Sequence, residues 1–454
     1  MTAVDGEHGG GRYRARVLGL AAIAAFAAVA VARWRGSTLA ATWFYDVAWW
    51  SYIVFADAIV YARTGSSLLI SRTRAFALLA LWSAAFWLAF EVANLRLENW
   101  YYVGLPRSPA ERAVGFLVSF ATVLPGILET QALLAAFGAF ERTRCAPFAL
   151  TRRSRAISIA LGVACAVLPL AFPRYAFALI WGVVPLVAER WLAARGARGL
   201  LSELARGRPA IVLQLLAAGL ACGVLWEAWN ACASARWIYS VPFFEDTKLF
   251  EMPLAGFLGF PPFALECYSF ARVLAALRLV PEWEAGDHER APIRVAPVRV
   301  APVRAALGAV AALAFCIPAI AGVERLTVRS TLPMVDEIDG VSPAFADACR
   351  RDGIRTTGEL LSEVRGRELD ALSAEFGAEP VSRWLESARL MEVRGLGARG
   401  ARWLASAGIL TVGELARSEP DALQARLAST ASGPAPSPSP AEVRTWVRGA
   451  RSES

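Results

Sequence analysis

Long apolar stretches recur along most of this chain and limit what it can fold into. An α-helix needs about 20 mainly apolar residues to cross the hydrocarbon core of a bilayer. Because a backbone inside lipid must satisfy its own hydrogen bonds, each stretch predicts a membrane-spanning helix. The sequence therefore predicts an all-α, polytopic helical bundle of about nine spans. The stretches lie at residues 17–33, 40–62, 74–95, 113–138, 155–172, 175–194, 209–231, 250–276 and 304–323.

The composition agrees with this interpretation and excludes several kinds of chemistry. Of the 454 residues, 56% are hydrophobic, against roughly half in soluble proteins. Only His8 and His288 are present, which argues against histidine-rich metal centres, haem ligation and a Ser-His-Asp triad. The 7 cysteines include no C-x-x-C pair, so neither a disulfide framework nor a zinc site is expected. No metal and no cofactor are therefore predicted.

Positive charge is distributed unevenly between the two sets of predicted loops. One set holds 21 Lys and Arg and the other holds 8. By the positive-inside rule the first set is cytoplasmic, and nine spans then place the C-terminal tail outside the cytoplasm. Losing one span would move the tail to the cytoplasm. The basic set is the N-terminus with the loops near 63–74, 141–155, 190–208 and 278–304, and the other set is the loops near 33–39, 96–112, 174 and 232–249.

The first apolar stretch has a second interpretation. It follows Arg12, Arg14 and Arg16, as a signal peptide would. No clean polar cleavage region follows it, which favours a span that stays in the mature protein.

Two segments of the membrane region resemble each other. Each has Glu-x-x-Asn near the end of a span, then an aromatic cluster, then a span with Pro and Glu. Because an even number of spans separates the copies, both face the same way, as in a parallel repeat. The first copy holds Glu91, Asn94, Trp100, Tyr101, Tyr102, Pro125 and Glu129, and the second holds Glu227, Asn230, Trp237, Tyr239, Pro261, Pro262 and Glu266.

The repeat divides the chain into four predicted parts. Residues 1–154 form a first four-span membrane repeat and residues 155–280 form a second. Residues 281–335 hold an Arg- and Pro-rich linker, "RVAPVRVAPVR", and the ninth span. We interpret the linker as an extended cytoplasmic connector near lipid headgroups. Residues 336–454 form the tail.

Carboxylates inside spans are the main candidates for function, because a carboxylate in hydrocarbon is costly and normally faces the protein interior or a cavity. Asn94 and Asn230 share a helix face with the glutamates three residues before them. The alternatives are that Glu91 and Glu227 reach the membrane interface, and that the aromatic residues form an interfacial belt. The prolines would kink or interrupt their spans. The candidates are Glu129, Glu266, Glu91 and Glu227, followed by Asp46, Asp57 and Glu251.

The aromatic cluster followed by Pro and Glu resembles the integral-membrane lycopene cyclase and carotenoid hydratase families. Trp100-Tyr101-Tyr102 and Trp237-Ile238-Tyr239 match the aromatic part. The resemblance implies a small helical bundle acting on polyene double bonds, with Glu129 and Glu266 protonating the substrate. In those families an adjacent Glu pair follows the Pro by two residues, whereas here a single Glu follows by four.

The tail contains two copies of one helical unit. Gly340 precedes Gly353 by thirteen residues, and Gly395 precedes Gly408 by the same interval. Each copy ends in a predicted closing helix with a buried tryptophan, Trp384 or Trp446. Thr411 with Glu414 predicts a capping box, and Thr356 or Thr357 with Glu359 predicts another. Residues 336–450 resemble the helix-hairpin-helix superfamily, most closely a branch of unknown function in which such units occur in tandem.

In DNA-binding members of that superfamily, hairpin amides and the next helix hold a phosphate. The resemblance assigns that role here to Gly395, Gly397 and Arg399. Residues 324–454 carry 17 Lys and Arg against 19 Asp and Glu, whereas phosphate binding draws its affinity from basic residues. Nucleic-acid binding therefore remains possible but is not favoured, and a folding or protein-interaction role is preferred.

Three functions are consistent with these patterns in a bacterial inner (plasma) membrane protein. The first is a membrane protein whose tail, residues 336–450, docks a protein partner. The second is a membrane enzyme that acts on a polyisoprenoid or carotenoid-like lipid, with intramembrane glutamates as general acids. The third is a transporter or channel whose path passes Glu91 and Glu227.

Overall fold

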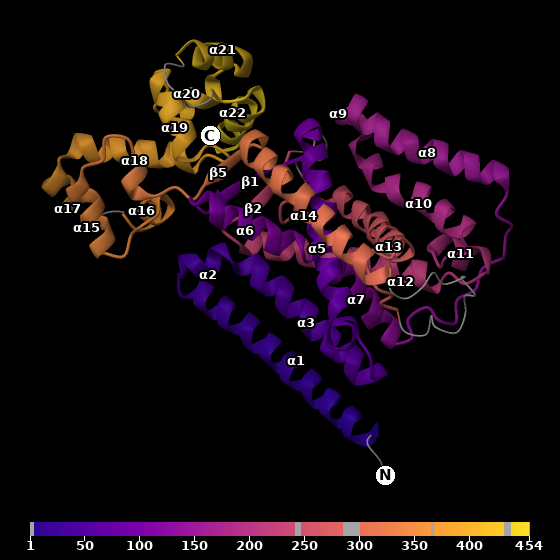
Figure 1. Cartoon of the computed structure of the whole chain (residues 1–454). Helices are drawn as coiled ribbons and strands as arrows, with labels where there is room; N and C mark the ends of the chain where they lie inside the picture. The colour runs from indigo at the N-terminus through magenta and orange to yellow at the C-terminus, as the bar shows by residue number, and fades with distance from the viewer. Residues whose placement is uncertain (1–3, 241–246, 285–299, 365–366, 431–436, 454) are drawn as a thin grey trace. The chain divides into compact units, whose positions relative to one another are not determined.

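The computed structural model describes residues 4–240, 247–284, 300–364, 367–430 and 437–453. Helices predominate, and the chain divides into two compact units (Figure 1). Most of the linker motif lies outside the described residues. Unit 1 is Met1–Asn99, Ala113–Ala233 and Tyr239–Leu326, and unit 2 is Trp100–Arg112, Ser234–Ile238 and Thr327–Ser454.

Among the described residues, 7 helices are long and apolar enough to cross a membrane. The other two predicted spans are also helical, as α3 (Phe44–Thr64) and α13 (Phe260–Ala276). Asp46, Asp57 and Arg63 make α3 more polar, and α13 has only 17 helical residues. The seven are Gly10–Trp34, Thr73–Leu97, Pro109–Ala136, Arg152–Ala171, Pro173–Ala194, Ala210–Cys232 and Pro302–Leu326.

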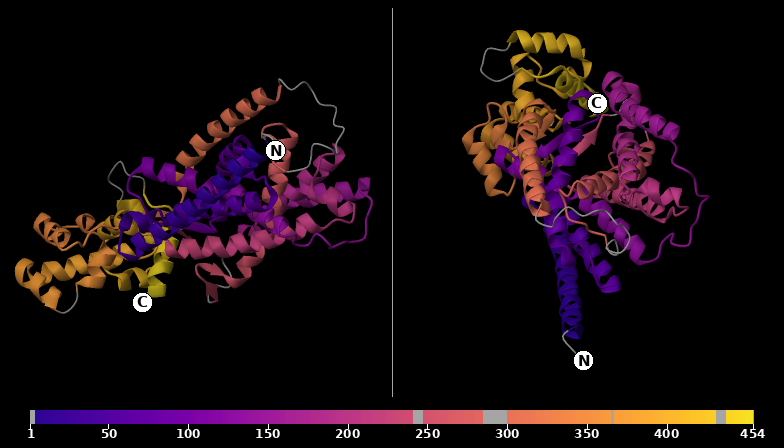
Figure 2. Two further views of the ribbon diagram at one scale, coloured as in Figure 1. Left: turned by 90° about the horizontal axis from the view of Figure 1, so that it is seen from below. Right: turned by 45° about the vertical axis from the view of Figure 1, so that its right-hand side comes forward.

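The two copies of the sequence repeat have the same order of elements. A helix is followed by a short helix, a second long helix, a strand, and a helix that carries the last glutamate. Helix α1 (Val4–Trp34) packs along α3, and Figures 1 and 2 show the two side by side. The first copy comprises α3, α4 (Leu68–Ser71), α5 (Thr73–Leu97), β1 (Trp100–Leu105), α6 (Pro109–Phe120) and α7 (Val123–Ala136). The second comprises α10 (Val183–Ala194), α11 (Leu200–Ala205), α12 (Ala210–Cys232), β2 (Arg236–Tyr239) and α13.

The remaining elements of unit 1 surround these copies. The segment 248–259, predicted as the start of a span, is instead made of two short strands and a 3-10 helix. The bounds are α2 (Thr38–Thr42), α8 (Arg152–Ala171), α9 (Pro173–Ala176), η1 (Phe177–Gly182), β3 (Lys248–Leu249), β4 (Met252–Pro253), η2 (Leu254–Gly259) and α14 (Val300–Leu326).

A buried carboxylate holds the short helix in each copy. Asp57, fully buried, accepts from the backbone N–H of Leu69 at 2.6 Å, and Glu189 accepts from the N–H of Leu201 at 3.0 Å. Each acceptor precedes its donor by twelve residues. The side chains therefore satisfy backbone groups that the short helices leave unpaired at their N-termini. This correspondence extends the repeat to helices that the sequence comparison did not align.

Both glutamate-bearing helices begin just before the prolines, as those residues predict. Helix α6 ends at Phe120 and α7 begins at Val123, two residues before Pro125. Ser83 bridges the break, because its hydroxyl donates to the Phe120 carbonyl at 2.6 Å and accepts from the Leu124 N–H at 2.9 Å. Backbone groups freed by the interruption are therefore paired inside the protein, as an apolar surrounding requires.

Unit 2 contains a three-stranded sheet that the all-α prediction did not include. Its order is β2-β1-β5, and β5 (Arg329–Thr331) pairs parallel with β1. Gly104 has a φ of 65°, and a Cβ there would collide with the Ser234 carbonyl. Glycine therefore permits the close approach between these two loops. Two loops of the membrane region and the strand after the last span thus fold together.

The tail forms the predicted pair of helical units. The indole N–H of Trp384 donates to the Gly340 carbonyl at 3.0 Å, and that of Trp446 donates to the Gly395 carbonyl at 2.8 Å. Each closing helix is therefore hydrogen-bonded to the first glycine of its own helical unit in the tail. The bounds are η4 (Val335–Glu337), α15 (Pro343–Arg351), α16 (Thr357–Glu363), α17 (Arg367–Phe376), α18 (Ala378–Glu392), α19 (Gly397–Ser406), α20 (Val412–Arg417), α21 (Pro420–Thr430) and α22 (Pro440–Glu453).

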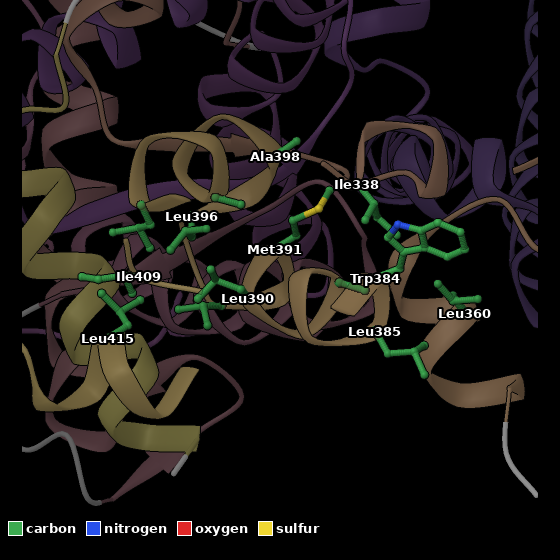
Figure 3. Packing of buried hydrophobic residues seen from close by; sticks show 14 of the residues in the cluster. Ile338, Leu360, Trp384, Leu385, Leu390, Met391, Leu396, Ala398, Ile409 and Leu415 are labelled. Atoms are coloured by element: carbon green, nitrogen blue, oxygen red, sulfur yellow. The ribbon is translucent and has the colours of Figure 1, made fainter. Parts of the chain in front are cut away.

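Both predicted capping boxes are present, with Thr356 rather than Thr357 in the first unit. Gly395, Gly397 and Gly408 have positive φ, as their turns require. One continuous apolar core joins the two helical units of the tail, and Figure 3 shows residues from α18 and α19 meeting within it. Leu404 is fully buried in this core, whereas Ala405 is only half-buried. The linker predicted at 431–440 lies largely outside the described residues.

The second capping box makes the N-terminus of α20 sensitive to pH. The N–H groups of Leu410 and Thr411 donate to Glu414 and lower the pKa of that carboxyl below its ordinary 4.5. A carboxyl whose pKa is lower in the folded state stabilises the fold at pH values above its unfolded-state pKa. That stabilisation is lost as the pH falls through the folded-state pKa. We expect the hydrogen-exchange protection factors of α20 amides in the full chain to fall below about pH 4.5.

In Glu414→Gln the protection of α20 should be lower at pH 6 and should no longer change with pH. Glu359→Gln, in the twin box, serves as the control and should alter α16 while leaving α20 unchanged. Equal pH dependence in wild type and Glu414→Gln would contradict this explanation.

Candidate functional site

The four candidate glutamates all lie inside unit 1 and are fully buried. Glu91 and Glu227 occupy matching positions in α5 and α12, and Glu129 and Glu266 occupy matching positions in α7 and α13. Neither Glu91 nor Glu227 reaches the surface. The four positions differ in what surrounds the carboxyl, and that difference separates them as candidates.

Glu91 and Glu227 are held by aromatic donors. The indole N–H of Trp87 donates to Glu91 at 2.9 Å, and the hydroxyl of Tyr239 donates to Glu227 at 2.8 Å. Asn94 accepts from the N–H of Asn99 at 2.8 Å, which caps the end of α5. These contacts give the Glu-x-x-Asn pairs a role in shaping the ends of the two helices. Asn230 is also fully buried, in the last turn of α12.

Glu129 lies beside a cluster of polar side chains in the first copy. Asp57 and Arg72 are close enough to interact with it electrostatically. The next residue, Thr130, bonds to the hydroxyl of Tyr52 at 2.8 Å and to the thiol of Cys222 at 3.2 Å. Glu129 therefore belongs to a packed polar contact between α3, α7 and α12, and it does not line the cavity described next.

Glu266 lines an apolar cavity of about 580 Å³ in unit 1. Its Oε1 accepts from the backbone N–H of Val184 at 3.2 Å. Its Oε2 is buried and has no hydrogen-bond partner among the described residues. A buried carboxyl oxygen without a partner is unfavourable unless something else binds it. Both carboxyl oxygens of Glu129 are likewise buried without a partner among the described residues. The position of Glu266 in the cavity wall therefore makes it the candidate residue for contact with a ligand.

The cavity walls come from five parts of the membrane region. Helix α5 contributes Trp82, Ala85 and Ala89 among others, and α8, the η1–α10 segment, α13 and α14 complete the wall. Among the described residues that line the cavity, Glu266 is the only ionisable one, and the others are aliphatic or aromatic. Such a wall suits an apolar molecule with few polar groups.

The sequence analysis missed the residues that make this space. Ala85, Ala89 and Ala93 recur every four residues and therefore lie on one face of α5. Their small side chains leave room where larger ones would fill it. That alanine spacing was the available signal, although small residues at this spacing also occur at plain helix contacts.

The predicted aromatic binding residues lie elsewhere. Trp100, Tyr101 and Tyr102 are buried in strand β1 of unit 2, and Trp237 is half-buried in strand β2. Tyr239 contacts one of the candidate glutamates, because its hydroxyl donates to Glu227. The structure thus places these rings in the strands that follow α5 and α12.

The second hairpin of the tail is packed against its own unit. A Cβ on Gly395 would lie 3.3 Å from the Tyr101 ring, and one on Gly397 would lie 3.0 Å from Ser330. Arg399 forms an ion pair with Glu442 of α22. The two glycines are thus approached by side chains of strands β1 and β5, and Arg399 is paired with a carboxylate.

No cluster of three or more metal-ligating side chains occurs among the residues that the structure describes. In the comparisons, residues 339–453 match the family described as a domain of unknown function, DUF4332. No curated protein and no solved structure matches the chain. The match covers the tail, so the membrane region is interpreted from its own residues.

The packing of the hairpin predicts that Arg399 stabilises unit 2 and does not bind nucleic acid. The purified full chain should not shift duplex DNA at a protein concentration of about 100 μM, where non-specific binding with Kd of about 1–100 μM is detected. Arg399→Ala should increase hydrogen exchange in α19 and α22, because Glu442 loses its partner. Arg402→Ala, an exposed arginine of the same helix, is the control and should change neither. Salt-dependent DNA binding that Arg399→Ala abolishes would overturn this assignment.

Proposed function

We propose that this chain is a multi-pass membrane protein that binds a lipid-like apolar molecule in the cavity of unit 1. The observation that carries the proposal is the cavity itself, with one carboxyl, Glu266, in a wall that is otherwise aliphatic and aromatic. A charged or strongly polar ligand would find too few partners there. The volume of about 580 Å³ falls within the range of about 300–1,000 Å³ that is typical of small-molecule sites.

The outer surfaces of the helices support a lipid surrounding. Leu161 of α8 and Leu307 and Ile317 of α14 are exposed by 51%, 64% and 71%. Soluble proteins rarely leave large apolar patches in water, whereas such faces are expected against lipid tails. A molecule taken up from the bilayer would reach the cavity without passing through water.

Glu266 also supports a catalytic version of this function, on a polyisoprenoid or carotenoid-like substrate. In its protonated form the carboxyl can transfer its proton to one carbon of a double bond, leaving a cation on the other carbon. An internal double bond of the substrate then attacks the cation and forms a ring. Loss of a proton from a neighbouring carbon to the carboxylate restores both the double bond and the acid. The reaction is an isomerisation and requires no cofactor.

Only one of the two glutamates that the family resemblance assigned to catalysis lines the cavity. Glu129 lies among Asp57, Thr130 and Tyr52, away from it. The general-acid proposal therefore rests on Glu266 alone. The first copy of the repeat supplies α5 to the cavity wall rather than a second acid.

The strand pairing supports a topology in which the tail lies outside the cytoplasm. Strands β1, β2 and β5 each follow a predicted span within a few residues and share one sheet. Because a sheet cannot form across a bilayer, the three span ends must face one side. Four predicted spans separate β1 from β2, and two separate β2 from β5. An even number of spans returns the chain to the same side of the membrane, so both counts agree with one shared side. With a cytoplasmic N-terminus, this side is the outside of a bacterial inner (plasma) membrane.

Unit 2 then serves as an extracytoplasmic platform for a protein partner, through residues 336–450. Its hairpin surface is covered by its own strands, which removes the phosphate-binding mode. The outer faces of its helices carry the exposed charges, such as the Arg350–Asp347 pair, that the rim of a protein interface uses.

Expression in a lycopene-producing host tests binding and catalysis separately. We expect the wild-type chain to retain a polyene through purification and to change the pigment of the host. Ala89→Trp fills the cavity and should remove the bound polyene. Glu266→Gln should keep the bound polyene but leave the pigment unchanged, and Glu129→Gln is the matched control. Pigments read by chromatography that are identical with and without the wild-type chain would reject the catalytic version. The absence of any bound apolar molecule would reject both.

The topology is tested with reporters fused after Ser454. A reporter active only outside the cytoplasm should be active, and one that works only in the cytoplasm should be silent. The reverse result would place β1, β2 and β5 on the cytoplasmic side and would require the opposite orientation for every span. A fusion at Thr143, in a predicted cytoplasmic loop, serves as the control.

A further inference from the structure

We infer that the molecule bound in the cavity is a long-chain alcohol, with a hydroxyl group that bonds to Glu266 and Trp82. The inference rests on the proposed function and names the class of ligand. Two polar atoms of the wall residues, Glu266 Oε2 and Trp82 Nε1, are buried without a hydrogen-bond partner among the described residues. The first accepts when the carboxyl is ionised and donates when the carboxyl is protonated, as the catalytic version requires; the second is an N–H that can only donate.

A hydroxyl group satisfies both atoms, because it donates one hydrogen bond and accepts others. An alkane can neither donate nor accept a hydrogen bond. A carboxylate accepts but cannot donate, and an ammonium group donates but cannot accept. Of the simple head groups that end a long apolar chain, the hydroxyl is therefore the one that matches the two unpartnered atoms in both protonation states of Glu266.

The charges of the wall also exclude ionised lipids. No Lys, Arg or His lines the cavity, so a phosphate or carboxylate would have no counter-charge and would meet Glu266. The thiols of Cys165 and Cys267 are also close enough to interact with Glu266, and neither offers a positive charge.

An amine is the strongest competing ligand. Phe86, Phe90 and Phe270 belong to the wall, and aromatic faces attract cations. The ammonium group would, however, require an ionised Glu266 held by a single backbone N–H, and it would leave Trp82 Nε1 unpaired. A neutral hydroxyl needs neither condition.

The inference is tested with four probes that share one chain length: hexadecanol, hexadecane, hexadecylamine and palmitate. The purified full chain is exchanged into one detergent, and bound radiolabelled probe is measured at equilibrium. We expect one hexadecanol per chain, held about tenfold more tightly than hexadecane because two buried polar atoms gain partners. Palmitate and hexadecylamine should bind more weakly than hexadecanol.

Variants separate the head group from the cavity. Glu266→Leu should remove the preference for hexadecanol over hexadecane while hexadecane still binds, and Trp82→Phe should reduce that preference in part. Ala89→Trp should weaken the binding of every probe. Glu129→Gln, the counterpart outside the cavity, should behave as wild type.

The outcomes distinguish this inference from the proposed function. Equal binding of hexadecanol and hexadecane, or tighter binding of the amine or the carboxylate, would overturn the inference that the ligand is an alcohol. The proposed apolar binding site would still stand. If Ala89→Trp does not weaken the binding of any probe, the cavity is not the binding site. That result would overturn both the alcohol inference and the proposed function.

Discussion

A polar group inside an apolar helical bundle needs a hydrogen-bond partner within the protein, because water is absent there. In unit 1, several backbone groups meet this requirement through hydrogen bonds to buried side chains. Asp57 and Glu189 accept from the N-termini of short helices, and Ser83 bridges the break before α7. Glu129 and Glu266 depart from this pattern, because carboxyl oxygens of both are buried without a hydrogen-bond partner among the described residues. Of the two, Glu266 lines the cavity, where a bound molecule would supply the missing partner.

The repeat explains how the two last glutamates can differ. The two copies share the position of the capping carboxylate. Glu129 lies beside Asp57 and packed polar side chains, whereas Glu266 lies in the wall of the cavity. The first copy still contributes, because the alanine face of α5 forms part of the wall. The cavity thus combines the first copy's packing surface with the second copy's acid.

The sequence predicted the helices well because their signals are local. Apolar length, prolines and capping boxes each act within a few residues, and Thr411 with Glu414 is present as predicted. The sheet was missed because its strands lie in three loops separated by about a hundred residues or more, and Trp100 and Tyr101 have the composition of an interfacial belt as well as of a strand. Glu266 was named from its spacing after Pro262, but its difference from Glu129 depends on packing between five segments. No local pattern records that packing.

The tail shows why a glycine pattern alone does not identify a binding surface. A helix-hairpin-helix turn needs glycines because its backbone approaches another group closely, and in DNA-binding proteins that group is a phosphate. Here the approaching groups are Tyr101 and Ser330 of strands β1 and β5. The same glycines are therefore required whether or not a phosphate is bound, and the motif alone cannot indicate nucleic acid. Charge makes the distinction, because carboxylates such as Glu442 pair with the arginines that a phosphate would need.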